Sequence, residues 1–158
     1  MSLCLYVENC QSINMAFQIS VFLENKIGHL ERVTSVLKEA GINILSMNLN
    51  HTSSGWGIVS LLVNKPEESF RLLTQKGISV ALRHIVVISM DDIPGALDGL
   101  LKSIAMAGIN FTTAYGRSGY EKGKACFIID VENIPDAALK LVNAGVQLLP
   151  DEIVYTLE

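Results

Sequence analysis

Short β-rich runs alternate with amphipathic stretches over most of the chain. Phe17–Leu23 and Ile85–Met90 are rich in large apolar and β-branched residues, which predicts two buried strands. After each run, apolar residues recur at spacings of three and four, which predicts a helix with one apolar face. These residues are Leu30, Val33, Val36, Leu37 and Ala40 in the first stretch and Leu97, Leu100, Leu101, Ile104 and Ala107 in the second. Gly41 and Gly108 follow directly, and glycine at this place commonly ends a helix.

Each predicted helix is followed by a hairpin, a second helix and a further strand. The hairpins are Ile42–Asn50 with Trp56–Val63 around the turn Thr52–Gly55, and Ile109–Arg117 with Lys124–Val131 around the turn Gly119–Gly123. The second helices are Pro66–Lys76 and Pro135–Ala144, because proline is favourable in a first helical turn. The strands Ile78–Leu82 and Val146–Leu149 come next, and the step at Pro150 allows one more short strand, Ile153–Leu157.

The two halves of the chain are copies of one unit. Gly28, Leu30 and Gly41-Ile42-Asn43 recur 67 residues later as Gly95, Leu97 and Gly108-Ile109-Asn110. From the hairpin onward the offset is 68, as for Val59 and Phe127, because one residue is inserted in the second copy. A shared offset over so many positions indicates an internal repeat.

The order β-α-β-β-α-β, found twice, predicts an α+β fold. We expect two ferredoxin-like units, each with an antiparallel sheet and its helices on one face. The first unit covers residues 17–83 and the second covers residues 84–158, with residues 1–16 as an N-terminal extension outside the repeat. Because this fold hosts many activities, function has to be argued from local motifs.

Composition and charge exclude several classes of protein. Apolar residues make up 49% of the chain and charged residues 18%, which is typical of a folded core. The net charge of −4 disfavours nucleic-acid binding, which depends on neutralising phosphates. No apolar run approaches the ~18 residues of a membrane span, and no signal peptide is visible. The cysteines Cys4, Cys10 and Cys126 are too few and scattered for a disulfide framework, so we expect a cytoplasmic protein.

Other ferredoxin-like modules lack their motifs here. An RNA-recognition module needs basic and aromatic residues on its third strand, and neither Trp56–Val63 nor Lys124–Asp130 carries that pattern. A metallochaperone needs CxxC in the first loop, and an acylphosphatase-like enzyme needs an arginine there. The loops Glu24–Gly28 and Asp91–Gly95 contain neither.

These loops instead resemble those of the ACT domain family, whose pattern is roughly D-x-P-G-x-L…G-I-N-I. The second copy matches through Asp92, Pro94, Gly95, Leu97 and Gly108-Ile109-Asn110. The first copy departs at Asn25 and Ile27, which replace the acid and the proline. The resemblance covers about residues 17–149 and implies a tandem ACT protein with no attached catalytic domain.

The resemblance implies a ligand site at the first loop and the start of the first helix, usually where two ACT units meet. Helix N-termini present unpaired N–H groups that suit a carboxylate. The candidate ligand-binding residues are Asn25, Ile27, Gly28, His29, Leu30 and Asn43 in the first copy and Asp92, Ile93, Pro94, Gly95, Ala96 and Asn110 in the second. The asparagines that open the second strand are expected to lie near the loop. If only one copy binds, the closer family match favours the Asp92 loop.

A purely local role remains open at each single position. Asn25 and Asp92 are also good helix caps, the loop glycines suit a turn, and Asn43 and Asn110 suit local backbone hydrogen bonds.

Several other polar or reactive residues carry weaker signals. His51 is expected at a hairpin end and His84 at the junction, with no clustering that suggests a metal site. We interpret Trp56 as a packing residue and Cys126 as buried and inert. Tyr115, Arg117 and Tyr120 suit an exposed amphipathic hairpin or a partner contact.

No nucleophile, base and orienting group fall at motif spacing, so we expect no catalytic residues, no metal and no cofactor. The leading hypothesis is a regulatory module that binds an amino acid at contacts between units and alters assembly or a partner. Free sheet edges favour a homodimer, and a metabolic enzyme is a candidate partner. The alternative is a ligand-free interaction module for a metabolic enzyme or transporter. A small enzyme with an unrecognised site is the third hypothesis.

Overall fold

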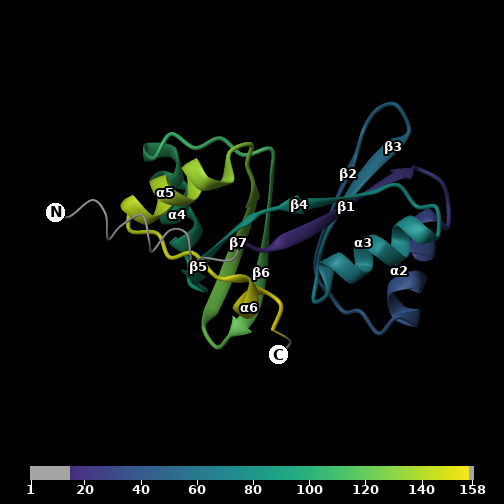
Figure 1. Ribbon diagram of the computed structural model, residues 1–158. Helices are drawn as coiled ribbons and strands as arrows, with labels where there is room; N and C mark the ends of the chain where they lie inside the picture. The colour runs from purple at the N-terminus through teal and green to yellow at the C-terminus, as the bar shows by residue number, and fades with distance from the viewer. Residues whose placement is uncertain (1–14, 157–158) are drawn as a thin grey trace. The chain divides into compact units, whose positions relative to one another are not determined.

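The computed structural model describes residues 15–156. The described chain forms two compact units: a first unit of residues 17–83 and a second unit of residues 84–156, to which Ala16 also belongs. The Ile85 N–H donates to the Ala16 carbonyl at 3.0 Å. Each unit is an antiparallel sheet with helices, so the predicted α+β class with tandem ferredoxin-like units is confirmed (Figure 1).

The first unit has the full β-α-β-β-α-β order. Its elements are β1 (Phe17–Glu24), α2 (His29–Glu39), β2 (Ile44–His51), β3 (Trp56–Val63), α3 (Pro66–Gln75) and β4 (Val80–His84). The strand order in the sheet is β2-β3-β1-β4, and β3 runs antiparallel to both β1 and β2. Glu24 pairs with Trp56 at one end of β1, and Ile44 pairs with Val63 at the other end of β3.

Alternation along the strands decides which side chains face the helices. Ile19 and Val21 of β1 and Val59, Leu61 and Val63 of β3 point to the helices, because successive strand side chains alternate between faces. They pack against Val33 and Leu37 of α2 and Leu73 of α3, all of them at most 1% exposed. The apolar face predicted for the first helix is therefore the one that forms this core.

The second unit repeats this plan with a weaker fourth strand. Its elements are β5 (Val86–Asp91), α4 (Ala96–Met106), β6 (Thr113–Glu121), β7 (Lys124–Asp130), α5 (Ile134–Asn143) and α6 (Asp151–Val154). The sheet order is β5-β7-β6, antiparallel throughout. The strand predicted over Val146–Leu149 is reduced to one bridge between Ile88 and Leu148. The core joins Val86, Ile88, Phe127 and Ile129 to Leu100 and Ile104 of α4 and Leu141 of α5.

The short strand predicted over Ile153–Leu157 is wrong as far as the described residues extend. Residues Asp151–Val154 form the helical turn α6. Pro150 supplies an extended N-cap, and the Asp151 carboxylate accepts the Glu152 N–H at 2.8 Å, which favours a helix start over a strand. The Arg117 guanidinium donates to the carbonyls of Val154 at 3.1 Å and Thr156 at 3.2 Å, which fixes the end of this turn against β6.

The second hairpin also differs from its prediction. Strand β6 begins at Thr113 rather than Ile109 and continues to Glu121, so that the turn shortens to Lys122 and Gly123. The register shifts between Ser118 and Glu121, where Gly119 has a φ of 75°. A bulge at this glycine lets the strand continue past the residues that indicated a turn.

Candidate functional site

The first loop ends in a glycine that starts helix α2. Gly28 is the N-cap, with φ 86° and ψ −9°, a left-handed conformation that costs other residues about 1–2 kcal/mol. The Asn25 N–H donates to the Gly55 carbonyl at 2.7 Å, which holds the loop against the first hairpin turn. The Arg32 N–H donates to the Gly28 carbonyl at 3.0 Å and closes the first helical turn.

The second loop repeats this geometry. Gly95 is the N-cap of α4, with φ 87° and ψ −12°, and the Gly99 N–H donates to its carbonyl at 3.1 Å. The Asp92 N–H donates to the Gly123 carbonyl at 3.0 Å, as Asn25 does to Gly55. The two loops are therefore copies in structure as well as in sequence.

The side chains of Asn25 and Asp92 do not cap these helices in the described structure. Neither N-cap has a side-chain hydrogen bond, because the caps are Gly28 and Gly95. A Cβ at either glycine would meet nothing within 4 Å. Glycine is required here by the left-handed backbone and not by lack of room, because the space beside each helix start is open.

The other loop residues form an exposed rim around each helix start. All of them are exposed: Asn25, Ile27, Asp92, Ile93 and Pro94. The accessible surface of Ile27 is 105% of its reference value in an extended chain, and that of Ile93 is 63%. His29, Leu30 and Ala96 are half-buried in the first turns of their helices. Apolar side chains this exposed suit contact with another molecule.

The two asparagines expected near the loops lie elsewhere, and that prediction is wrong. Asn43 precedes β2 next to Val63, whereas the first loop lies next to Trp56 at the opposite end of β3. At a strand rise of about 3.3 Å per residue, the two ends are roughly 20 Å apart. Asn110 likewise lies at the Asp130 end of β7, and Asp92 at the Lys124 end. The helix between the two strands returns the chain to the far end of the sheet, which accounts for the separation.

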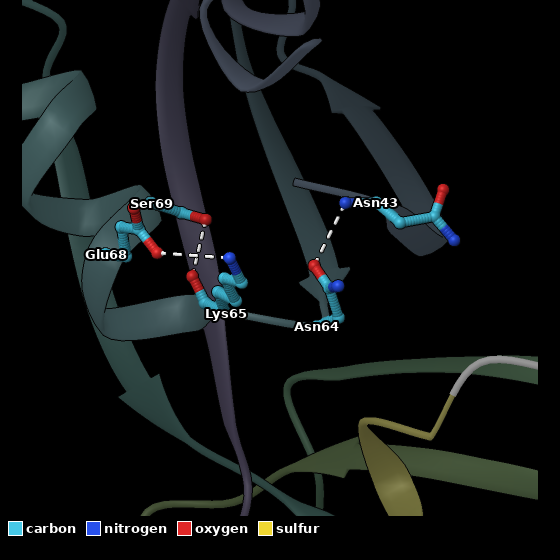
Figure 2. A network of polar contacts seen from close by, with 5 residues as sticks. All are labelled: Asn43, Asn64, Lys65, Glu68 and Ser69. Atoms are coloured by element: carbon cyan, nitrogen blue, oxygen red, sulfur yellow. Dashed lines mark hydrogen bonds and ion pairs between the residues drawn. The ribbon is translucent and has the colours of Figure 1, made fainter. Parts of the chain in front are cut away.

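Asn43 is held by Asn64 through a pair of hydrogen bonds. The Asn43 N–H donates to Asn64 Oδ1 at 2.9 Å, and the Asn64 N–H donates to the Asn43 carbonyl at 3.2 Å. Figure 2 shows the Asn43 amide directed away from Asn64, beside the bonds of Ser69 to the Lys65 carbonyl and of Lys65 to Glu68. The backbone of Asn43 is thus occupied locally, and its side chain is exposed.

A pocket of about 180 Å³ lies beside the first loop. Its lining combines apolar residues of the first core with charged residues at the start of α2. The lining residues are Phe22, Leu23, Glu24, His29, Arg32, Val33, Trp56, Gly77, Ile78 and Ser79. We call this space the first-loop pocket. Of the predicted site residues, it includes His29.

A second pocket of about 330 Å³ lies in the second unit, between the chain before β6 and the start of α5. It includes the predicted residue Asn110 together with Phe111, Glu132, Asn133, Asp136 and Lys140. Asn133 caps α5 by accepting the Asp136 N–H at 3.1 Å, and Lys140 pairs with Asp136 at 2.7 Å. Its polar groups are therefore largely engaged with one another.

Trp56 is not a core residue, contrary to its interpretation as packing, because 50% of its surface is exposed at the pocket rim.

The second hairpin is not an exposed amphipathic surface, contrary to its prediction. Tyr120 is buried with its hydroxyl 2.6 Å from Ser89 Oγ, and Arg117 binds the end of α6. Burial raises the pKa of the Tyr115 phenol well above its usual range.

Cys126 is buried, as predicted, and burial raises the pKa of its thiol, which disfavours the reactive thiolate. Within residues 15–156, no group of three or more His, Cys, Asp or Glu side chains is placed to hold a metal ion. No helix in the same range is long and apolar enough to cross a membrane.

Sequence reasoning missed Glu24, Arg32 and Trp56 as candidate site residues. Arg32 and Trp56 differ in chemistry from their equivalents in the second copy, and Glu24 shares only its charge with its equivalent. The comparison of the two copies selected identical residues, so it passed over all three. For Arg32 and Trp56, the signal that could have found them was a charged or aromatic residue present in only one copy, since the second copy has Gly99 and Lys124 there. Glu24 is matched by Asp91 and gave no such signal.

Comparison with known proteins gives a family and a fold. The family model described as ACT domain pair matches residues 14–157. A crystal structure of a protein from Bacteroides thetaiotaomicron superposes with a TM-score of 0.82 at 28% identity, covering 92% of this chain and 99% of that one. The ligand-free regulatory subunit of aspartate kinase from Thermus thermophilus superposes with a TM-score of 0.60 at 17% identity, covering 84% and 95%. The corresponding subunit from Thermus flavus gives 0.56 at 17%, covering 85% and 95%. No curated protein matches the sequence significantly.

Proposed function

Because the chain belongs to the ACT domain pair family, we propose that it is a regulatory rather than catalytic module, which binds an amino acid and transmits that binding to its own assembly or to a partner. The observation that carries this proposal is the pair of glycine-capped helix starts, built twice with the same backbone geometry. Each start presents N–H groups that a carboxylate can accept, next to open space.

The separation of the loop from Asn43 and Asn110 supports a site made by two molecules. Within one unit these groups lie at opposite ends of the sheet. We propose that a unit of a second copy, paired antiparallel with the first, supplies its asparagine to the loop of the first. A homodimer is the assembly that supplies this arrangement, and sedimentation velocity with and without amino acids tests it.

A metabolic enzyme of the reducing cytoplasm is the proposed partner class. The regulatory subunits of aspartate kinase that share the fold are themselves parts of an enzyme. A ligand changes such an assembly only by the difference between its affinities for the two states.

One observation favours the alternative of a ligand-free interaction module. Ile27 and Ile93 stand exposed in the two loops, at neighbouring rather than equivalent positions of the repeat, and exposed apolar side chains of this kind suit a protein partner. Under this alternative the loops bind another protein, and amino acids leave the stability of the chain unchanged.

A thermal unfolding screen against the twenty amino acids and common nucleotides separates the two. A ligand at about 100 times its Kd stabilises the native state by about 2.7 kcal/mol, which raises Tm by several degrees for a chain of this size. We expect a selective rise with one or a few amino acids and none with nucleotides. Unchanged melting with every amino acid at millimolar concentration would instead support the interaction module.

A further inference from the structure

The first-loop pocket has an apolar floor and a charged rim. Leu23, Val33 and Ile78 belong to or pack on the first core and supply the floor. Glu24, His29, Arg32 and Trp56 surround the opening. A small ligand with one apolar end and one charged end fits such a lining better than a fully polar or fully apolar molecule.

Opposite charges meet at this rim. Glu24 pairs with Lys26, and that hydrogen bond lowers the pKa of the Glu24 carboxyl, so Glu24 is ionised at neutral pH. Arg32 donates one N–H to the Lys76 carbonyl at 3.0 Å. A guanidinium has five N–H donors, so this bond orients Arg32 and leaves donors for a carboxylate.

The second unit carries the same backbone without this chemistry. Register and helix-start hydrogen bonds match Glu24, Arg32 and Trp56 to Asp91, Gly99 and Lys124. His29 corresponds to Ala96, since each follows its N-cap glycine. The acid is paired with a lysine in both units, but that lysine is Lys26 of the loop in the first unit and Lys124 of the opposite strand, 2.6 Å from Asp91, in the second. Only the first unit therefore has an indole, that of Trp56, opposite the acid.

We infer that the first unit holds the ligand site of this chain and that it takes an α-amino acid with an apolar side chain. The carboxylate binds Arg32 and His29 at the start of α2, the ammonium binds Glu24, and the side chain lies between Trp56 and the apolar floor. The inference rests on the proposed function and adds the ligand class and the unit that binds it. It reverses the expectation that the Asp92 loop is the better site.

Trp56 gives a direct readout, because it is the one tryptophan of the 158-residue chain. We would titrate the full chain with L-leucine, L-methionine and L-phenylalanine and follow tryptophan fluorescence. We expect a saturable change with at least one of them. Two analogues of leucine, 3-methylbutylamine without the carboxylate and 4-methylpentanoate without the ammonium, should each bind roughly tenfold or more weakly, since each lacks one charged hydrogen bond.

Two variants test the residues, with a matched control. Arg32→Gln should weaken binding roughly tenfold to a hundredfold, whereas Lys38→Gln, an exposed residue of the same helix outside the pocket lining, should leave the Kd unchanged. Trp56→Lys places an ammonium opposite Glu24, as in the second unit, and should abolish the thermal stabilisation by the same amino acid. Circular dichroism establishes that each variant is folded.

The outcomes separate this inference from the proposed function. Stabilisation by an amino acid that leaves Trp56 fluorescence unchanged and survives Arg32→Gln would overturn the first-loop pocket and keep the amino-acid module. Binding of polar amino acids alone would overturn the apolar ligand class. Failure of every amino acid to stabilise or bind would overturn both proposals.

Discussion

At the scale of single residues, Gly95 and Gly99 lie one helical turn apart, and only Gly95 has a backbone conformation that requires glycine. Gly95 has a φ of 87°, whereas Gly99 lies inside α4 with helical backbone and open space where a Cβ would be. Only the first is required by the fold, and Gly28 holds the equivalent place in the first unit. The repeat in the sequence could identify Gly28 and Gly95, because identical spacing implied identical backbone. It could not identify Arg32 or Trp56, because the second copy has the chemically different residues Gly99 and Lys124 at the equivalent positions.

Alanine substitutions at the two glycines should therefore change stability in opposite directions. Gly95→Ala is expected to lower the free energy of unfolding by about 1–2 kcal/mol, from left-handed strain. Gly99→Ala is expected to raise it by about 0.5–1 kcal/mol, from higher helix propensity. Urea unfolding of both variants beside the parent chain measures this. Equal destabilisation by the two would contradict the assigned conformation of the loop.

At the scale of elements, the type and place of the strongly periodic strands and helices were predicted correctly, but their first and last residues were predicted only to within a few positions. Trp56–Val63 forms β3 as predicted, because the run is rich in apolar and β-branched residues and follows a glycine-containing turn. The region after Leu149 was misread because a proline followed by β-branched residues suits either an edge strand or a helix start. Besides the helix start at Pro150 and Asp151, the folded chain brings in Arg117, which is distant in sequence and binds the carbonyls at the end of α6.

Arg117→Ala tests the role of that contact in holding α6. Loss of two hydrogen bonds from a charged donor should lower the stability of the second unit by about 1–3 kcal/mol. Ser118→Ala, a neighbouring exposed position, serves as the control and should change it by less than about 0.5 kcal/mol. Hydrogen exchange should show faster exchange of amides in residues 151–156 in the arginine variant alone. Unchanged exchange there would show that α6 is held by other contacts.

At the scale of the whole molecule, the two repeated units share a backbone plan but carry different side chains on their surfaces. Both units keep the glycine-capped loop and pair the acid at its edge with a lysine, but the residue opposite that acid is Trp56 in the first unit and Lys124 in the second. Pattern matching predicted the shared architecture because buried positions restrict residue type on both copies. The distribution of binding chemistry could not be predicted in this way, since surface positions are free to diverge, and the distance from each loop to its asparagine appears only once the chain is folded.

The most direct test of amino-acid binding is equilibrium dialysis of the purified full-length chain against an equimolar mixture of the twenty amino acids, with the retained amino acids quantified by mass spectrometry. We predict enrichment of one or a few amino acids on the protein side, saturable and lost on thermal denaturation. Equal concentrations of all twenty on both sides, at protein concentrations high enough to retain a millimolar ligand, would contradict the account and leave a ligand-free interaction module in its place.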